Sequence, residues 1–254
     1  MKITFSILNA FAAIFLAAGP VAVAGVSNPA PLGAELTRKF PFSMAGQLIF
    51  KNGAGYYQAS GTVVNQHSVL TAAHNLWSAE SGWSTQMQFN RARSGATIAS
   101  RTFANRLFIF GSYRNAAAQY GPDSIRSFSN DLGGLRFNGM PASGMYAGWR
   151  ADANLLTGSA AGICLGYGAE IHSGDELLAV RPGVSFIPAL GAFMENLSIT
   201  FEAGMSGGPI FFEVAPDELR IVGVVVAGSN TPPAAGIRAI DAAGAAFINT
   251  YLRY

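Results

Sequence analysis

The stretch Gly204-Met205-Ser206-Gly207-Gly208-Pro209 holds one serine among glycines, and the apolar run Ile210-Phe211-Phe212 follows it directly. Glycine adopts positive φ angles easily and lets backbone N–H groups approach a bound molecule closely. Two such N–H groups beside a serine hydroxyl suit acyl transfer, because they stabilise the oxyanion that forms when the hydroxyl attacks a carbonyl. Ser206 is therefore a candidate nucleophile, although the same pattern also occurs in a tight turn with a structural serine.

A serine nucleophile needs a base, and the chain has only three histidines, His67, His74 and His172. His74 follows the short segment Val69–Ala73, which predicts a titratable ring at the end of a strand. Imidazole suits the role because its pKa lies near neutrality, so it can accept and return a proton. The other two histidines lie in polar segments and are expected at the surface.

The third group in such a constellation is a buried carboxylate that orients the imidazole, and the chain has only 14 acidic residues. Asp131 is the best candidate, because the apolar and glycine residues of 132–135 follow it immediately. Asp123 and Asp152 remain rivals, but both lie in polar loops.

The segments Thr71-Ala72-Ala73-His74, Asp131-Leu132 and Gly204–Pro209 occur in the order His, Asp, Ser. They resemble the three signature segments of the chymotrypsin/trypsin-like serine peptidases. Gly166-Tyr167-Gly168 and the run Ile221–Ser229 extend the resemblance, which runs from about Phe42 to the C-terminus. Cys164 is the only cysteine, so no intramolecular disulfide can form. In this the chain resembles the bacterial, disulfide-free branch of the family, which includes glutamyl-endopeptidase-like enzymes.

The resemblance implies an all-β, chymotrypsin-like fold of two six-stranded antiparallel β-barrels with a C-terminal helix. The residue pattern agrees in class, because many short strand-like segments between turn residues indicate a barrel or a sandwich. A hairpin is predicted around Asn52-Gly53. After Asp241, a good helix N-cap, apolar residues recur at helical spacing. Residues 111–129 are polar without a clear period and are predicted as a long surface loop.

The domain prediction starts with a signal peptide at residues 1–24, where Lys2 precedes the apolar stretch Ile3–Ala18 and Ala22-Val23-Ala24 fits a cleavage site. An uncleaved membrane anchor is the alternative, which the break at Gly19-Pro20 disfavours. Residues 25–40 are predicted as an N-terminal arm or short pro-segment, 41–140 as the first barrel, and 141–254 as the second barrel with a linker and the terminal helix. We expect a secreted or periplasmic protein without stable membrane insertion.

The resemblance assigns His74, Asp131 and Ser206 as catalytic residues and the backbone N–H groups of Gly204 and Ser206 as the oxyanion hole. Met205 departs from the family pattern, because trypsin-like zymogens carry an acidic residue there that pairs with a newly formed N-terminal amine. Methionine cannot form this ion pair, but its apolar side chain could hold the turn by packing.

The same resemblance places the substrate pocket at Thr200, Val226 and Gly228. A neutral hydroxyl at the pocket floor argues against a strong preference for Arg or Lys in the substrate. Glu202 is expected near this pocket, where its charge would disfavour acidic substrate side chains.

The sequence predicts a serine endopeptidase that cleaves protein or peptide substrates through an acyl-enzyme and acts as a monomer. A catalytically weak or inactive binding protein with the same fold is the alternative, because Met205 departs from the family pattern and the Asp131 segment matches it less closely. An α/β-hydrolase esterase is disfavoured, because its triad order is Ser, Asp, His. No cofactor or metal is expected from three scattered histidines and one cysteine. A net charge of +2 with dispersed Lys and Arg gives no indication of nucleic acid binding.

Overall fold

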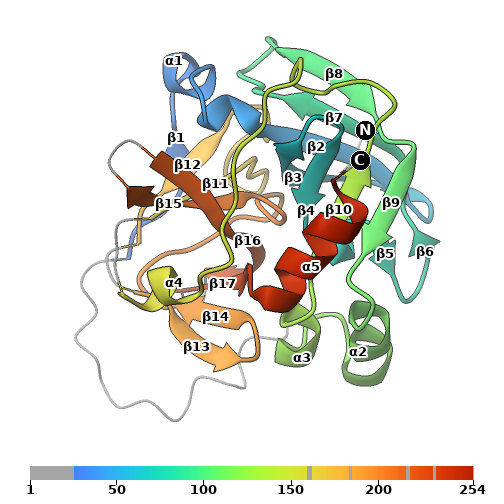
Figure 1. Ribbon diagram of the computed structural model, residues 1–254, viewed down its shortest axis with the longest axis vertical. Helices are drawn as coiled ribbons and strands as arrows, with labels where there is room; N and C mark the ends of the chain where they lie inside the picture. Colours follow the sequence, from blue (N-terminus) through green and yellow to red (C-terminus); the bar gives the residue numbers. More distant parts are fainter. Residues whose placement is uncertain (1–25, 159–161, 183–184, 216–217, 231–232, 254) are drawn as a thin grey trace.

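The computed structural model describes residues 26–158, 162–182, 185–215, 218–230 and 233–253. The predicted signal peptide lies outside the described residues. Most of the strands belong to two antiparallel sheets, one from each half of the chain (Figure 1). The larger cluster of buried apolar side chains draws residues from both sheets, among them Leu48 and Val224. The two halves therefore share part of one core.

The first sheet has seven strands in the order β8-β7-β2-β3-β4-β10-β9. Their bounds are β2 Ala45–Asn52, β3 Gly55–Asn65, β4 Ser68–Thr71, β7 Thr85–Arg91, β8 Ser100–Phe103, β9 Arg106–Ile109 and β10 Gly133–Arg136. The predicted hairpin is confirmed: Asn52 pairs with Gly55, and Gly53 has a φ of 57°. A small separate hairpin, β5 Trp77–Ser78 and β6 Gly82–Trp83, lies beside this sheet.

The second sheet has eight strands in the order β1-β12-β11-β15-β16-β17-β14-β13. Their bounds are β1 Ala30–Pro31, β11 Ile163–Gly166, β12 Leu178–Val180, β13 Ile187–Leu190, β14 Phe193–Asn196, β15 Pro209–Ala215, β16 Glu218–Asn230 and β17 Pro233–Ala239. The predicted all-β fold with two β units and a terminal helix is confirmed. The sheets have seven and eight strands instead of the predicted six each, and in the second sheet the short edge strands β1 and β13 account for the excess.

The terminal helix α5, Ala242–Tyr251, begins where the sequence predicts. The carboxylate of its N-cap Asp241 accepts a hydrogen bond from the N–H of Gly244 at 2.8 Å. The helix follows the second sheet but packs on the first (Figure 1): the ring of Phe247 lies 6.1 Å from that of Phe110, and Leu252 covers Gly134. The C-terminal segment thereby holds the two halves together.

The prediction of a structureless loop at 111–129 is wrong, because two helices form there, α2 Tyr113–Tyr120 and α3 Ile125–Phe128. Three consecutive alanines at 116–118 favour a helix in α2, and the hydroxyl of Ser124 caps α3 by accepting from the N–H of Ser127. These local preferences outweigh the absence of an apolar period. The end of α3 leads directly to Asp131, whose N–H donates to the carbonyl of Phe128.

The segment that follows the predicted signal peptide is hydrogen-bonded to the second half of the chain. The N–H of Ser27 donates to the carbonyl of Ser198 at 2.8 Å, and Ala30 pairs with Ala179 of β12. Leu32 continues this contact by donating to the carbonyl of Leu177. The prolines of this segment hide its strand character in the sequence, since proline has no N–H and is tolerated at a sheet edge.

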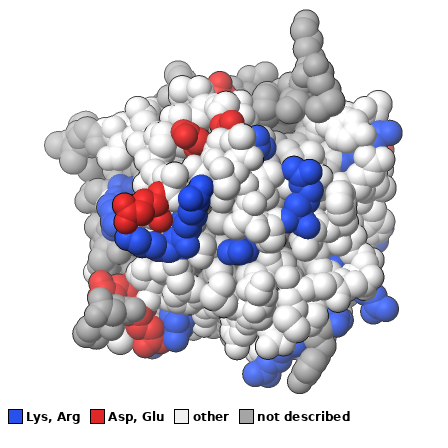
Figure 2. Space-filling view, turned by 90° about the horizontal axis from the view of Figure 1, so that it is seen from above, with Lys and Arg blue, Asp and Glu red and all other residues white. Residues whose placement is uncertain are grey.

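Four short elements complete the described fold: the helices α1 Ala34–Thr37 and α4 Asn154–Gly158, and the 3₁₀ turns η2 Phe42–Met44 and η3 Ala73–Asn75. On the face in Figure 2, one mixed group of blue and red side chains lies at the left, and most other charged groups are separated by uncharged surface. No helix among the described residues has the length and apolar character that a membrane span requires.

Candidate active site

Two neighbouring strands of the first sheet bring His74 and Asp131 together. His74 lies in the 3₁₀ turn η3 just after β4, and Asp131 lies just before β10. These strands are antiparallel, with Thr71 opposite Gly133, so the end of one meets the start of the other. Gly133 permits this approach, because a Cβ there would lie 3.1 Å from the Cα of Ala73.

Asp131 holds His74 through two contacts. Its Oδ2 lies 2.5 Å from Nδ1 of the imidazole, and its Oδ1 accepts from the backbone N–H of His74 at 2.9 Å. The carboxylate is fully buried, whereas the His74 side chain is 15% exposed. Because a carboxylate only accepts, Nδ1 carries the proton in this contact, and Nε2 of the neutral ring is left as an acceptor.

The pKa of His74 reflects two opposing effects. Burial lowers the pKa of the imidazole, but the charge and hydrogen bond of Asp131 raise it by more, and the charge of Asp123 adds to the rise. The net pKa therefore lies above the ordinary value for histidine. The imidazolium form, which a base adopts after taking up a proton, is stabilised at this position.

Ser206 lies in the turn before β15 and is anchored to β3 and to the turn that carries His74. Its carbonyl accepts from the N–H of Ser60 at 2.9 Å and from the side-chain amide of Asn75 at 3.1 Å. Asn75 directly follows His74, so this bond links the serine to the histidine turn.

One contact expected of a triad is not formed in this structure. Within the described residues, neither the Ser206 hydroxyl nor Nε2 of His74 has a hydrogen-bond partner, so the two side chains do not bond each other. Such bonds are often long without substrate and tighten when it binds. The structure thus brings His74 to Asp131 directly and to Ser206 only through the backbone.

The turn around Ser206 leaves two N–H groups free. Among the described residues, the N–H groups of Gly204 and Ser206 have no acceptor, whereas those of three neighbours are all bonded: Met205 to Glu202, Gly207 to Val225 and Gly208 to Met205. Gly204 has a φ of +98°, a conformation that favours glycine. Two unsatisfied donors beside a serine hydroxyl are the arrangement that an oxyanion hole requires.

Met205 is fully buried in the apolar cluster of the second half. It packs against β11, where a Cβ on Gly166 would lie 2.8 Å from the Met205 Cβ. Apolar packing thus fixes the position at which the resemblance would place an ion pair.

The three residues assigned to the substrate pocket are largely covered. The hydroxyl of Thr200 donates to Oδ1 of Asn28 at 3.0 Å, and Val226 belongs to the buried core. Gly228 lies so close to the neighbouring chain that a Cβ would be 2.6 Å from the carbonyl of Phe201. Asn28 is a site neighbour that the sequence does not indicate, because it lies more than 170 residues away in the chain.

The rival carboxylates take different positions. Asp152 forms an ion pair with Arg150 at 3.4 Å. Asp123 is half-buried and within electrostatic reach of both His74 and Asp131. Burial raises the pKa of Asp123, with the nearby charge of His74 opposing this rise. Asp123 therefore acts on the site through its charge rather than by direct contact with the imidazole.

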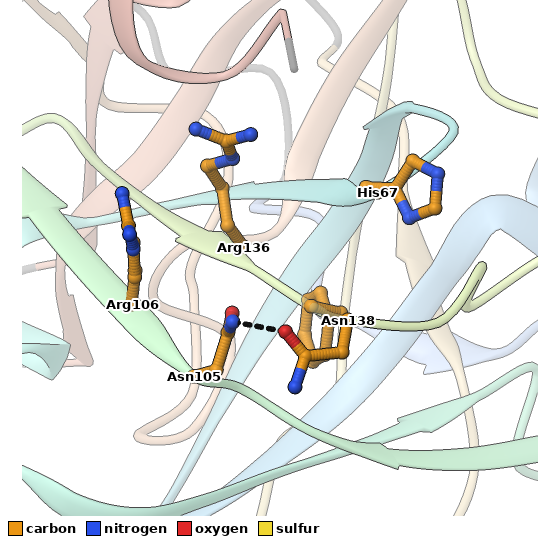
Figure 3. Close-up of a pocket in the computed structure, with 6 residues that line it drawn as sticks. His67, Asn105, Arg106, Arg136 and Asn138 are labelled. Carbon is orange, nitrogen blue, oxygen red and sulfur yellow. Dashed lines mark hydrogen bonds between the residues drawn. The ribbon is translucent and has the colours of Figure 1, made fainter.

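His67 lies in the turn between β3 and β4, at the opposite end of β4 from His74. It lines a surface hollow of about 370 Å³ with Arg106 and Arg136, while Asn105 and Asn138 bond each other at its rim (Figure 3). Its Nδ1 lies 3.1 Å from the carbonyl of Gly139. The structure therefore agrees with a surface position for this histidine, away from Ser206.

His172 and Glu202 form a pair that sequence reasoning missed. The sequence predicts His172 at the surface and Glu202 near the substrate pocket, but no contact between them; in the structure, Nδ1 of His172 lies 2.5 Å from Oε1 of Glu202. The Glu202 side chain is only 1% exposed, so it does not face substrate. The only available signal was a lone acidic residue in an apolar segment two positions before Gly204.

Cys164 is fully buried within β11. Burial raises the pKa of its thiol far above the ordinary value. A buried thiol without a nearby base is a core residue. In the described part of the chain, no group of three or more His, Cys, Asp or Glu residues is arranged to hold a metal ion.

Known structures share this architecture. A Glu endopeptidase solved in complex with MPD superposes with a TM-score of 0.70 at 17% identity, covering 90% of this chain and 98% of that one. The chain has the chymotrypsin-like fold. Protease Anisep from Arthrobacter nicotinovorans matches with a TM-score of 0.65 at 17% identity, over 84% of this chain and 96% of that one. A chain described as a scabies mite inactivated protease paralogue matches with a TM-score of 0.61 at 13% identity, over 83% of this chain and 95% of that one.

Comparison by sequence finds less similarity to known proteins than comparison by structure does. No protein-family model matches it. An extracellular metalloprotease of Bacillus subtilis is 26% identical over 129 residues, which is 50% of this chain and 38% of that protein. The matched segment thus spans well under half of the relative.

Proposed function

We propose that this protein is a secreted serine endopeptidase that hydrolyses peptide bonds through an acyl-enzyme. The observation that carries the proposal is that the Asp131–His74 pair is linked through Asn75 to the Ser206 turn, in which the N–H groups of Gly204 and Ser206 have no acceptor among the described residues. The neighbours with this fold include proteins described as proteases, which agrees with the proposal.

In the proposed reaction, Oγ of Ser206 attacks the carbonyl carbon of the scissile peptide bond while Nε2 of His74 takes the hydroxyl proton. The imidazolium then gives this proton to the leaving amine, and the acyl group remains on Ser206. Water repeats the sequence on the ester and releases the acid. Asp131 keeps the imidazole in the tautomer with Nε2 free and stabilises the imidazolium by its charge.

The free N–H groups of Gly204 and Ser206 are the proposed oxyanion donors. They bind the carbonyl oxygen more strongly when it becomes negatively charged than in the substrate, which lowers the barrier. Losing one such donor typically costs about 3 kcal/mol of transition-state stabilisation.

The signal pattern of residues 1–24 supports export, so the proposed protein is secreted or periplasmic. The substrates are proteins or peptides. Because one cysteine cannot form an internal disulfide, the fold depends on its core packing in that environment.

A fluorophosphonate probe on the mature protein tests the proposal. We expect labelling at Ser206, loss of labelling in Ser206→Ala, and strongly slowed labelling in His74→Ala. Cleavage of a peptide library by the wild type, absent in both variants, completes the test. Correctly folded wild type that neither reacts with the probe nor cleaves any peptide would overturn the proposal.

A second candidate is a peptide-binding protein without turnover. Two observations favour it: Ser206 and His74 are not hydrogen-bonded, and the hydroxyl of Thr200 is engaged by Asn28. A neighbour with this fold is described as an inactivated protease, so the fold alone does not decide. Saturable binding of a peptide that stays uncut, together with the absence of probe labelling, would favour this candidate.

A further inference from the structure

A carboxylate buried behind the Ser206 turn has an unusually complete set of partners. The Glu202 side chain is 1% exposed, and burying a charge without partners is costly. Three donors converge on it: Nδ1 of His172 on Oε1, and the backbone N–H groups of Ile171 and His172 on Oε2, both at 3.2 Å. All three belong to the segment 169–175, which follows Gly168. The carboxylate therefore binds this segment to the irregular stretch of chain that leads into the turn.

The same segment holds the peptide unit that contains the N–H of Gly204. The N–H of Ala169 donates to the carbonyl of Ala203 at 2.8 Å. Because the C=O and N–H of one planar trans peptide point in opposite directions, fixing the Ala203 carbonyl toward Ala169 directs the Gly204 N–H away from it. This N–H is one of the two that remain free.

Two glycines allow the segment and the turn to lie this close. A Cβ on Gly168 would be 2.6 Å from Oε2 of Glu202, and one on Gly204 would be 2.5 Å from the carbonyl of Tyr167. The carbonyl of Glu202 also accepts from the N–H of Met205 at 3.0 Å. The carboxylate, the segment and the turn thus form one connected hydrogen-bonded unit.

We propose that Glu202 and His172 are positioning residues that fix the orientation of the Gly204 N–H through residues 169–172. The inference rests on the proposed peptidase function for its catalytic consequence, but the orientation itself does not depend on that function. Met205 cannot anchor the turn by charge, whereas the Glu202 carboxylate binds the adjoining segment through three hydrogen bonds. Neither residue touches the substrate in this role.

The kinetic test compares Glu202→Gln and His172→Ala with His67→Ala as the matched control. His67 is also partly buried with its Nδ1 near a carbonyl, but it lies away from the turn. We expect Glu202→Gln to lower kcat for peptide hydrolysis about 10- to 100-fold with KM changed less than about threefold, because an oxyanion donor acts mainly on the transition state. His172→Ala should have a smaller effect, since two backbone donors remain, and His67→Ala should have none.

Hydrogen exchange provides a readout that needs no activity. The amides of Ala169 and Met205 donate the bonds described above, so both should exchange faster in Glu202→Gln than in wild type and His67→Ala. Amides of β2 and β3 serve as the internal reference for global unfolding. Should Glu202→Gln fail to fold, His172→Ala is measured in the same way, because its side chain is 28% exposed and its removal leaves the core intact.

The outcomes separate the inference from the proposed function. Unchanged exchange at both amides with kcat within about twofold of wild type would overturn the inference and leave the peptidase function standing. An inactive wild type with faster exchange in Glu202→Gln would overturn the function and support the inference. A parallel loss of kcat and rise in KM, with exchange increased throughout β2 and β3, would reduce the pair to general stabilisation and overturn the positioning role.

Discussion

Replacing Ser60 by alanine should weaken both the fold and the turn that carries the nucleophile. The hydroxyl of Ser60 is buried in β3, donates to the carbonyl of Gly204 at 2.8 Å and accepts from the N–H of Tyr167 at 2.8 Å. It therefore joins the first sheet to the Ser206 turn and to the segment that follows β11. The bond from its own N–H to the Ser206 carbonyl does not involve the side chain and should persist.

The magnitude follows from the two groups that Ser60→Ala leaves without partners. A buried donor or acceptor that loses its hydrogen bond costs about 1–3 kcal/mol. Two such groups give a loss of about 2–6 kcal/mol in the free energy of unfolding. Because the Gly204 carbonyl is one of them, kcat/KM should also fall about 10- to 100-fold.

Ser68→Ala is the matched control. Ser68 is fully buried in β4, one strand away, but its hydroxyl has no partner among the described residues. Removing an unsatisfied buried hydroxyl should leave stability unchanged or raise it by about 1 kcal/mol. Urea unfolding measures both free energies, and peptide hydrolysis measures kcat/KM. Equal losses for the two variants, or a Ser60→Ala variant as stable and active as wild type, would refute the reasoning.

Two further predictions concern the site, and a third concerns the buried cysteine. Asp131→Asn should lower kcat by about 10⁴-fold, since an amide no longer selects the tautomer with Nε2 free; a loss below tenfold in a steady-state assay would contradict this. Asp123→Asn removes a negative charge that raises the pKa of His74, so the acid limb of the pH profile of kcat/KM should move to lower pH, and a shift to higher pH would be inconsistent. Cys164 should resist thiol reagents in the native protein and react only after unfolding in urea, with activity unchanged by the reagent; loss of activity on modification of folded protein would argue against a core role.

Local patterns predicted a large part of the fold. The hairpin at Asn52-Gly53 and the helix after Asp241 depend on residues close together in the chain, because turn geometry and capping are local. The strand character of Ile210–Phe212 is equally local. The helices at 113–120 and 125–128 were missed, since weak propensity and a single cap are hard to recognise without an apolar period.

Part of the candidate site is likewise visible in the sequence, and part of it is not. The order of His74, Asp131 and Ser206 is visible in three short motifs, and the structure brings the first two into direct contact. The contact of Asn28 with Thr200 could not be predicted, because it joins segments 172 residues apart. Each partner alone is an ordinary polar residue with no distinctive neighbours.

The sequence by itself determined which residues have the chemistry of a nucleophile, a base and an orienting carboxylate, because side-chain type and the glycines of the turn are properties of short segments. Only the tertiary structure decided which N–H groups stay free, that Thr200 is covered, and that Glu202 is paired with His172. These properties depend on which backbone and side-chain groups of distant segments meet. A hydrogen-bond donor is free or satisfied only in relation to acceptors that the fold brings to it, and the residue carrying the donor does not specify them.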